Sequence, residues 1–173
     1  LSSSSAASDV YKRQGVIMSS DGIIVTNFHV IKNAVQIKIL LHDGRESPAE
    51  IIDWDREIDL AILKVNLDDL KPISLGNPDS AKVGDIVLAI GNPKGIGQAV
   101  TQGIISAVGI NGLRLNSLEN FIQTDAAINE GSSGGALIDI YGNLLGINTL
   151  SLNGNGASGI GFAIPVSYTH LRA

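Results

Sequence analysis

The chain is built almost entirely from short apolar runs that are separated by turn signals. Typical runs are Ile23–Asn27, Leu60–Val65 and Ile86–Ile90, which are rich in β-branched side chains. No helical hydrophobic period is sustained over about 11 residues, the shortest window in which a helix can be read from its pattern. Short strands between glycine-rich turns predict an all-β barrel or sandwich.

Turn residues locate the expected hairpins and divide the chain. Ser20-Asp21-Gly22 and Asp43-Gly44 each lie between two strand-like runs, as hairpin turns do. A polar, proline-containing stretch at residues 71–85 predicts a linker. We therefore expect two antiparallel β-barrels: an incomplete N-terminal barrel at residues 15–70 and a C-terminal barrel at residues 86–166.

The two ends of the chain differ from the rest. Residues 1–14 are serine-rich, residues 167–173 are polar, and neither stretch shares the strand periodicity. They resemble translated adapter sequence, and we predict a non-native leader and a non-native tail. The alternative is a natural serine-rich leader and a natural polar tail.

Composition excludes several function classes. The 173 residues include no cysteine, which rules out disulfides and a thiol nucleophile. The net charge is −5 and no basic run is present, so we expect no nucleic-acid partner. No His/Asp/Glu cluster has metal-ligand spacing, so we expect neither a metal nor a cofactor. No apolar stretch reaches the roughly 20 residues of a membrane span.

Candidate catalytic chemistry begins at Gly131-Ser132-Ser133-Gly134-Gly135. A serine nucleophile needs a bent backbone and nearby N–H donors, and flanking glycines permit both. The amides of Gly131 and Ser133 would form an oxyanion hole. A plain turn between two strands is the alternative, and Ser132 is the alternative nucleophile.

A base and a carboxylate complete the candidate set. His29 ends an apolar strand, and Asp59 precedes the apolar run Leu60-Ala61-Ile62-Leu63. Each residue also has a purely structural alternative: His29 as a hydrogen-bonded histidine at a strand end, and Asp59 as a solvated acid in a turn. Together with Ser133 they occur in the order His, Asp, Ser, which is the order of chymotrypsin-like proteases.

Several blocks resemble one family more specifically. GVIMSSDGIIVTNFHVI, VGDIVLAIGNP and FIQTDAAINEGSSGGALID are similar to successive segments of HtrA/Deg serine proteases, with the DegS-type branch the most similar. This resemblance implies a catalytic triad of His29, Asp59 and Ser133. It also implies an ATP-independent endopeptidase that cleaves unfolded or stress-marked proteins in the periplasm, in protein quality control or stress signalling.

The resemblance carries further expectations. It implies a homotrimer formed through an N-terminal segment that is missing here, a missing PDZ domain, and an export signal or inner-membrane anchor outside this sequence. Ala127, six residues before Ser133, would lie at the base of the S1 pocket and favour small aliphatic P1 residues. Asn148, Thr149 and Leu150 would pair with the substrate backbone. The alternative function is a non-cleaving peptide-binding or chaperone homologue of the same fold.

Overall fold

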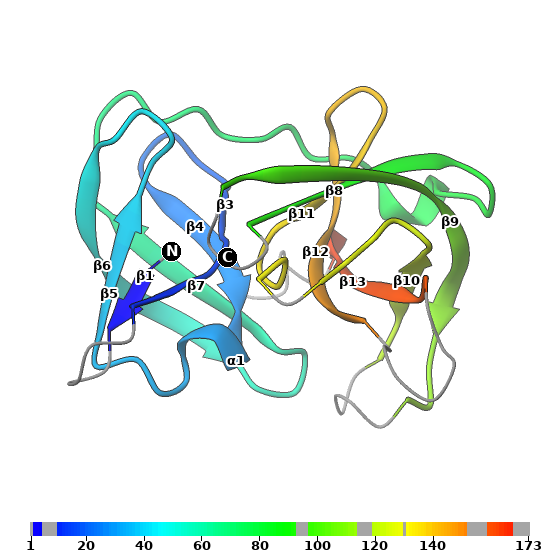
Figure 1. The fold of residues 1–173 in the computed structure, drawn as a ribbon, viewed down its shortest axis with the longest axis horizontal. Helices are drawn as coiled ribbons and strands as arrows, with labels where there is room; N and C mark the ends of the chain where they lie inside the picture. The colour runs from blue at the N-terminus through cyan, green and yellow to red at the C-terminus, as the bar shows by residue number, and fades with distance from the viewer. Residues whose placement is uncertain are drawn as a thin grey trace.

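The computed structural model describes residues 2–4, 10–92, 97–113, 119–129, 131–151 and 159–167. Most of the predicted tail, from residue 168 onward, lies outside these ranges. Within them the chain forms two β-structures that lie side by side (Figure 1). The prediction of an all-β fold with two antiparallel barrels, the N-terminal one incomplete, is confirmed.

The N-terminal half is an open seven-stranded antiparallel sheet in the order β2-β1-β5-β6-β7-β4-β3. Its strands are β1 (Ser2–Ser4), β2 (Val10–Lys12), β3 (Val16–Ile17), β4 (Ile23–Asn27), β5 (Gln36–Leu40), β6 (Glu46–Asp55) and β7 (Leu60–Val65). The hairpin turn predicted at Ser20-Asp21-Gly22 joins β3 to β4, with Gly22 at a φ of 102°. The turn predicted at Asp43-Gly44 joins β5 to β6.

The C-terminal half is a closed barrel in the order β10-β13-β12-β11-β8-β9. Its strands are β8 (Ile86–Gly91), β9 (Ala99–Ile110), β10 (Phe121–Thr124), β11 (Ala136–Asp139), β12 (Leu144–Ser151) and β13 (Gly161–Pro165). Every strand pairs antiparallel with its neighbours. Closure leaves the barrel with no free edge, which favours a rigid support for loops.

Three elements differ from the sequence expectation. Strands β1 and β2 lie in the segment predicted to be a non-native leader, where serine-rich sequence gives no apolar alternation. A one-turn helix, α1 (Phe28–Ile31), follows β4 directly, and the predicted linker holds a 3₁₀ turn, Pro78–Ser80. His29 therefore lies within α1 and not at the end of a strand.

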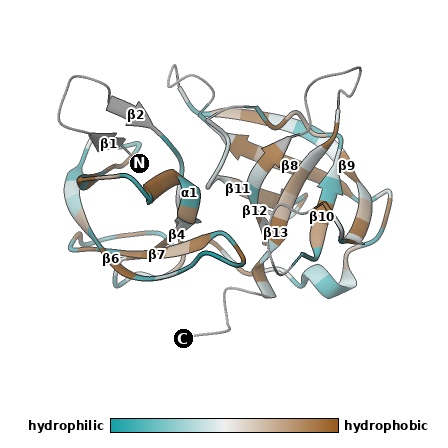
Figure 2. Ribbon diagram, turned by 90° about the horizontal axis from the view of Figure 1, so that it is seen from below, coloured by the Kyte–Doolittle hydropathy of each residue, from teal (hydrophilic) through white to brown (hydrophobic). Residues whose placement is uncertain are grey.

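One apolar cluster joins the two halves. It combines Val25 and Leu60 of the N-terminal sheet with Phe121, Leu144 and Phe162 of the barrel, all at most 5% exposed. Phe121 and Phe162 meet edge to face, with ring centroids 5.9 Å apart. Burying each such side chain stabilises the fold by roughly 1.5–3 kcal/mol. Figure 2 shows apolar segments on the strands of both halves. This shared core holds the loops of the two halves against each other.

Candidate active site

His29 and Asp59 both come from the N-terminal half. β4 pairs with β7 so that Asn27 lies opposite Leu60, which brings the start of α1 beside the turn before β7. The Nδ1 atom of His29 lies 2.6 Å from the Oδ2 atom of Asp59. An ionised carboxylate only accepts hydrogen bonds, so Nδ1 carries the hydrogen and Nε2 is left with a lone pair. The imidazole is thus oriented as a proton acceptor.

Asp59 is held in an unusual backbone conformation. Its φ is 59°, a left-handed value that costs a non-glycine residue about 1–3 kcal/mol. Its carbonyl accepts hydrogen bonds from the Phe28 amide and the Asn27 side chain, both at 3.1 Å. Its carboxylate accepts the His29 backbone amide at 2.8 Å and the Thr149 hydroxyl at 3.1 Å. With the His29 ring, these contacts fix a carboxylate whose side chain is only 11% exposed.

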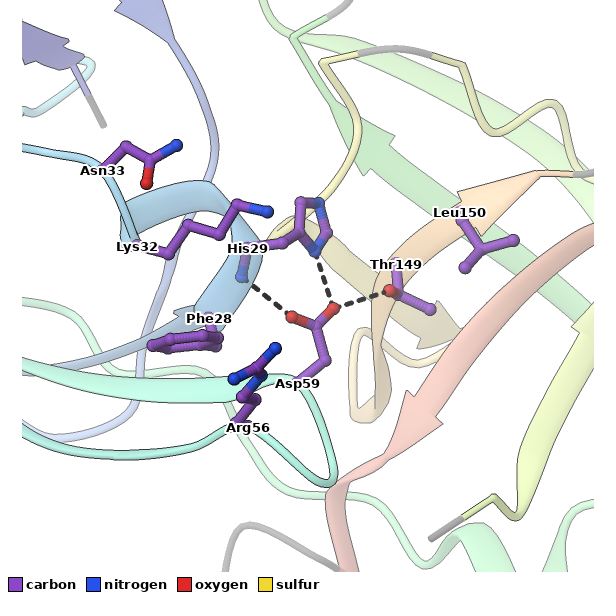
Figure 3. Close-up of a pocket in the computed structure, with 8 residues that line it drawn as sticks. All are labelled: Phe28, His29, Lys32, Asn33, Arg56, Asp59, Thr149 and Leu150. Atoms are coloured by element: carbon purple, nitrogen blue, oxygen red, sulfur yellow. Dashed lines mark hydrogen bonds and ion pairs between the residues drawn. The ribbon is translucent and has the colours of Figure 1, made fainter. Parts of the chain in front are cut away.

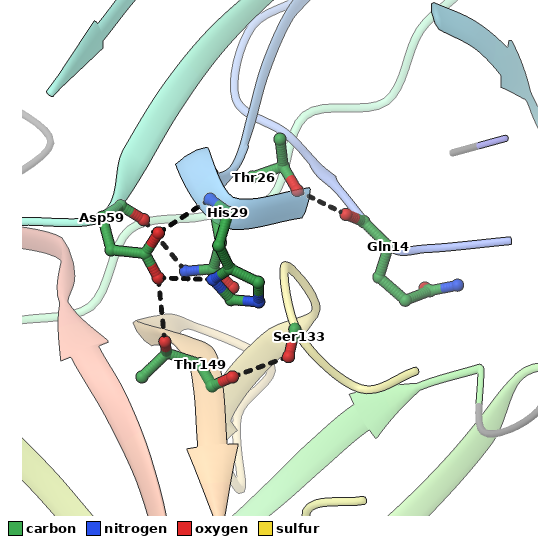
Figure 4. A network of polar contacts seen from close by, with 7 residues as sticks. Gln14, Thr26, His29, Asp59, Ser133 and Thr149 are labelled. Carbon is green, nitrogen blue, oxygen red and sulfur yellow. Dashed lines mark hydrogen bonds and ion pairs between the residues drawn. The ribbon is translucent and has the colours of Figure 1, made fainter. Parts of the chain in front are cut away.

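Thr149 connects the two halves of the site. It lies on β12 of the barrel, in the bulge between Asn148 and Leu150, and its hydroxyl donates across the interface to Asp59. Its carbonyl accepts a hydrogen bond from the Ser133 hydroxyl at 2.6 Å. Thr149 therefore links Ser133, through its carbonyl, to the Asp59–His29 pair, through its hydroxyl (Figure 4). In that view the His29 ring lies between Asp59 and Ser133. The sequence predicts Thr149 on the substrate strand but carries no signal for its contact with Asp59.

The two neighbouring serines have different surroundings. Ser132 is 5% exposed, its hydroxyl accepts a hydrogen bond from the Asn129 amide, and it packs against Gly91. A Cβ at position 91 would lie 2.5 Å from the Ser132 Oγ atom, so only glycine fits there. Ser133 is half-buried, and its hydroxyl reaches Thr149. Of the two serines, Ser133 alone is linked to the His29–Asp59 pair.

The loop that carries Ser133 touches the N-terminal half directly. Gly134 has a φ of 84°, and a Cβ there would lie 2.2 Å from the Gln14 carbonyl oxygen and 2.3 Å from the Thr26 hydroxyl. The Thr26 hydroxyl itself donates to the Gln14 carbonyl at 2.7 Å. Glycine at position 134 therefore permits the close approach of the two halves at the site.

Gly131 has a φ of 98°, which turns the backbone just before the two serines. Its carbonyl accepts a hydrogen bond from the Asn92 amide at 3.4 Å. Among the described residues, the amides of Gly131 and Ser133 donate to no acceptor. These two N–H groups are the donors that the sequence predicted for an oxyanion hole.

Asn148 supports the loop at residues 131–135, the serine loop, through side-chain and backbone hydrogen bonds. Its side chain is fully buried and donates to the carbonyls of Ile90 and Ala136, and its own backbone pairs with Gly134 and Gly135. Both backbone groups of Asn148 thus bind the serine loop. Its predicted pairing with a substrate stays a prediction, as it does for Thr149 and Leu150.

A hollow of about 560 Å³ opens beside the His29–Asp59 pair (Figure 3). Its walls include Phe28 from α1 and Leu150 from β12. Ala127 lies outside this hollow; it is exposed, and its carbonyl accepts a hydrogen bond from the Thr101 hydroxyl. Its predicted role at the base of the S1 pocket stays a prediction.

The residues that the structure describes contain neither a metal-binding cluster nor a membrane-spanning helix. No group of three or more His, Asp and Glu side chains is placed to hold a metal ion. No helix in the same ranges is long and apolar enough to cross a membrane.

Comparisons with known proteins identify the family. The trypsin-like peptidase domain pattern matches residues 13–147. The chain belongs to this family, in its HtrA/Deg branch. The periplasmic pH-dependent serine endoprotease DegQ of Escherichia coli (strain K12) is 51% identical over 152 residues, which are 87% of this chain and 33% of that protein. A probable periplasmic DegP-like serine endoprotease of Chlamydia pneumoniae is 50% identical, over 87% of this chain and 31% of that protein.

Solved HtrA structures have the same fold as this domain. The HtrA-type protease AlgW with a decapeptide has a TM-score of 0.86 and 55% identity, over 89% of this chain and 48% of that one. The serine endoprotease from Yersinia pestis has a TM-score of 0.84 and 47% identity, over 97% of this chain and 58% of that one. The predicted membership of the HtrA/Deg family is thus confirmed, and the AlgW structures support the DegS-type branch. This HtrA-type domain spans about a third of the length of its curated relatives.

Proposed function

We propose that this HtrA-type domain is a serine endopeptidase in which Ser133 is the nucleophile, His29 the general base and Asp59 the residue that orients His29. The observation that carries the proposal is the contact of His29 Nδ1 with the Asp59 carboxylate, beside a serine loop that Thr149 links to the same carboxylate. Serine becomes a useful nucleophile only when a positioned base takes its proton. The Asp59 contact leaves His29 Nε2 free to do so.

The reaction follows from these positions. The Ser133 hydroxyl turns from the Thr149 carbonyl toward His29, which takes its proton as the oxygen attacks the substrate carbonyl carbon. The tetrahedral intermediate collapses when His29 gives that proton to the leaving amine, so that the C–N bond breaks and an acyl-enzyme forms. A water molecule then attacks the ester in the same way and releases the acid.

Two backbone amides would stabilise the negative charge that develops on the substrate oxygen. We assign the oxyanion hole to the amides of Gly131 and Ser133, because neither meets an acceptor among the described residues. Losing one such donor lowers the rate by roughly 10²–10³-fold in comparable sites. Asp59 stabilises the imidazolium that appears at the same moment.

The substrates that we propose are unfolded or stress-marked polypeptides. Thr149 and Leu150 lie near the end of β12 beside the triad and would pair with an extended substrate backbone, a contact that tolerates many sequences. Uncharged Ala127 would favour a small aliphatic side chain at the cleaved position. AlgW, a related structure, holds a decapeptide, which is consistent with a polypeptide substrate here.

The whole protein would act outside the cytoplasm. Curated relatives are named periplasmic endoproteases, and we propose a periplasmic role in protein quality control or stress signalling. The chain spans about a third of the length of those relatives. For the full-length protein we therefore propose a PDZ domain, an export signal or membrane anchor, and a homotrimeric assembly.

A second candidate is a peptide-binding homologue that does not cleave. The observation in its favour is that the Ser133 hydroxyl donates to the Thr149 carbonyl and not to His29. In that case the same strand would bind unfolded chains as a chaperone does.

Cleavage of a fluorophore-labelled unfolded protein distinguishes the two candidates. Ser133→Ala removes the proposed nucleophile, and Ser132→Ala is the matched control one residue away. We expect Ser133→Ala to abolish cleavage while peptide binding persists, and Ser132→Ala to retain most activity. Absence of cleavage by the unsubstituted protein, with peptide binding intact, would favour the binding homologue.

A further inference from the structure

The hollow beside His29 carries a charge pattern that the triad does not explain. Lys32 from the chain just after α1 and Arg56 from the turn before Asp59 both line it. Figure 3 shows their charged ends on one side of the His29–Asp59 pair, with Thr149 and Leu150 on the other. Two cations thus face a space next to the His29–Asp59 pair.

Neither cation is used elsewhere in the part of the chain that the structure describes. Lys32 and Arg56 are exposed, and neither forms an ion pair there. By contrast, Arg45 pairs with Asp43 and Lys64 pairs with Asp21. In a chain of net charge −5, two unpaired cations on one hollow are an unusual concentration of positive charge.

The acids near the hollow do not cancel this charge. Asp59 is the one acid in its lining, and that carboxylate is turned toward His29 and Thr149 with 11% of its side chain exposed. Asp55 and Glu57 flank Arg56 in sequence, but neither side chain lines the hollow. The space therefore favours a negatively charged group.

Strand geometry indicates which substrate residue would enter the hollow. In an extended strand, successive side chains point to opposite faces. If the side chain at the cleaved position points toward Ala127, the residue before it points the other way, toward His29 and Leu150. His29 and Leu150 line the hollow and Ala127 does not, which fits a hollow on that second face.

We propose that this hollow is the binding site for the P2 side chain, the residue before the cleaved one, and that Lys32 and Arg56 make it select Asp or Glu. This inference rests on the proposed peptidase function, because it fixes the position of the cleaved residue. Arg56 offers a planar donor pair that matches a carboxylate, and Lys32 adds a mobile second charge. Phe28 supplies an apolar wall for the methylene groups of the acid.

The test compares three fluorogenic peptides that are identical except for Glu, Gln or Lys at P2. We expect the unsubstituted protein to cleave the Glu peptide with a kcat/KM about two- to fivefold above that of the Gln peptide, the range for exposed ion pairs. The Lys peptide should be the poorest. At 1 M salt, where the Debye length is about 3 Å, the Glu/Gln ratio should fall toward one.

Variants assign this preference to the two cations. The double variant K32Q/R56Q should bring the Glu/Gln ratio to about one, whereas K82Q, which removes a cation outside the hollow, should leave the ratio unchanged. A ratio of one or less in the unsubstituted protein would overturn the inference. So would a Glu preference that survives in the double variant.

Measured peptide affinities distinguish a failure of this inference from a failure of the peptidase proposal. The affinities of the Glu and Gln peptides for the Ser133→Ala variant can be measured by fluorescence anisotropy, whatever the cleavage result. A Glu preference in binding that needs Lys32 and Arg56, without cleavage by the unsubstituted protein, supports the subsite and refutes the peptidase. Cleavage of all peptides with equal affinities supports the peptidase and refutes the subsite.

Discussion

Gly134→Ala tests the contact between the serine loop and the N-terminal half. The added Cβ would lie 2.2 Å from the Gln14 carbonyl oxygen and 2.3 Å from the Thr26 hydroxyl, and the residue would keep a φ of 84°. The left-handed conformation costs an alanine roughly 1–2 kcal/mol. Relieving the overlap by moving backbone costs about 1–3 kcal/mol more. We therefore expect the free energy of unfolding to fall by about 2–5 kcal/mol.

Gly44→Ala is the matched control for this variant. Gly44 has nearly the same φ, 88°, but a Cβ there would meet no atom within 4 Å. It should lose only the conformational part, about 1–2 kcal/mol. For a chain of this length, about 1 kcal/mol lowers Tm by roughly 2–4 °C, so thermal unfolding followed by circular dichroism resolves the two variants. Equal Tm values for Gly134→Ala and Gly44→Ala would show that the two halves do not meet at this loop.

Three other variants probe the site and its support. Asp59→Asn should lower kcat by about 10³–10⁴-fold with little change in KM, because an amide no longer fixes the His29 tautomer; an unchanged kcat would contradict the assignment. Thr149→Val removes one of the carboxylate's donors and should lower kcat/KM about tenfold, whereas Thr149→Ser should stay near the unsubstituted value; equal losses would point to packing alone. Partial burial raises the pKa of Asp139, but hydrogen bonds from the Asn143 side chain and backbone outweigh it, so the pKa lies below its ordinary value. Asp139 therefore stabilises the fold at neutral pH and loses this effect as the pH falls below about 4. Asp139→Asn should lower the free energy of unfolding, measured with denaturant, by about 1 kcal/mol at neutral pH and leave it unchanged in acid.

Much of the fold was predictable because the strands carry their own signals. The apolar runs Ile23–Asn27 and Leu60–Val65 match β4 and β7 residue for residue. Their alternation and the glycine turns beside them are local properties of the sequence. Strands β1 and β2 carry no apolar pattern, because the pairing of β1 with β5 and of β2 with β1 comes from the tertiary fold.

The site was predictable in its residue types but not in its supporting contacts. The order of His29, Asp59 and Ser133 and their surroundings pointed to a triad. The hydroxyl donation from Thr149 to Asp59 joins two residues that are 90 positions apart in sequence. No local pattern reports such a contact. For the same reason the sequence did not signal that Lys32 and Arg56 share one hollow.

A serine-directed phosphonate tests the central claim most directly. After the protein reacts with the reagent, mass spectrometry of its proteolytic fragments identifies the modified residue. We expect one adduct, on Ser133, and its loss when His29 is replaced by alanine, because the hydroxyl needs the imidazole to become nucleophilic. An adduct on Ser132, or labelling of Ser133 that proceeds as fast without His29, would contradict the triad.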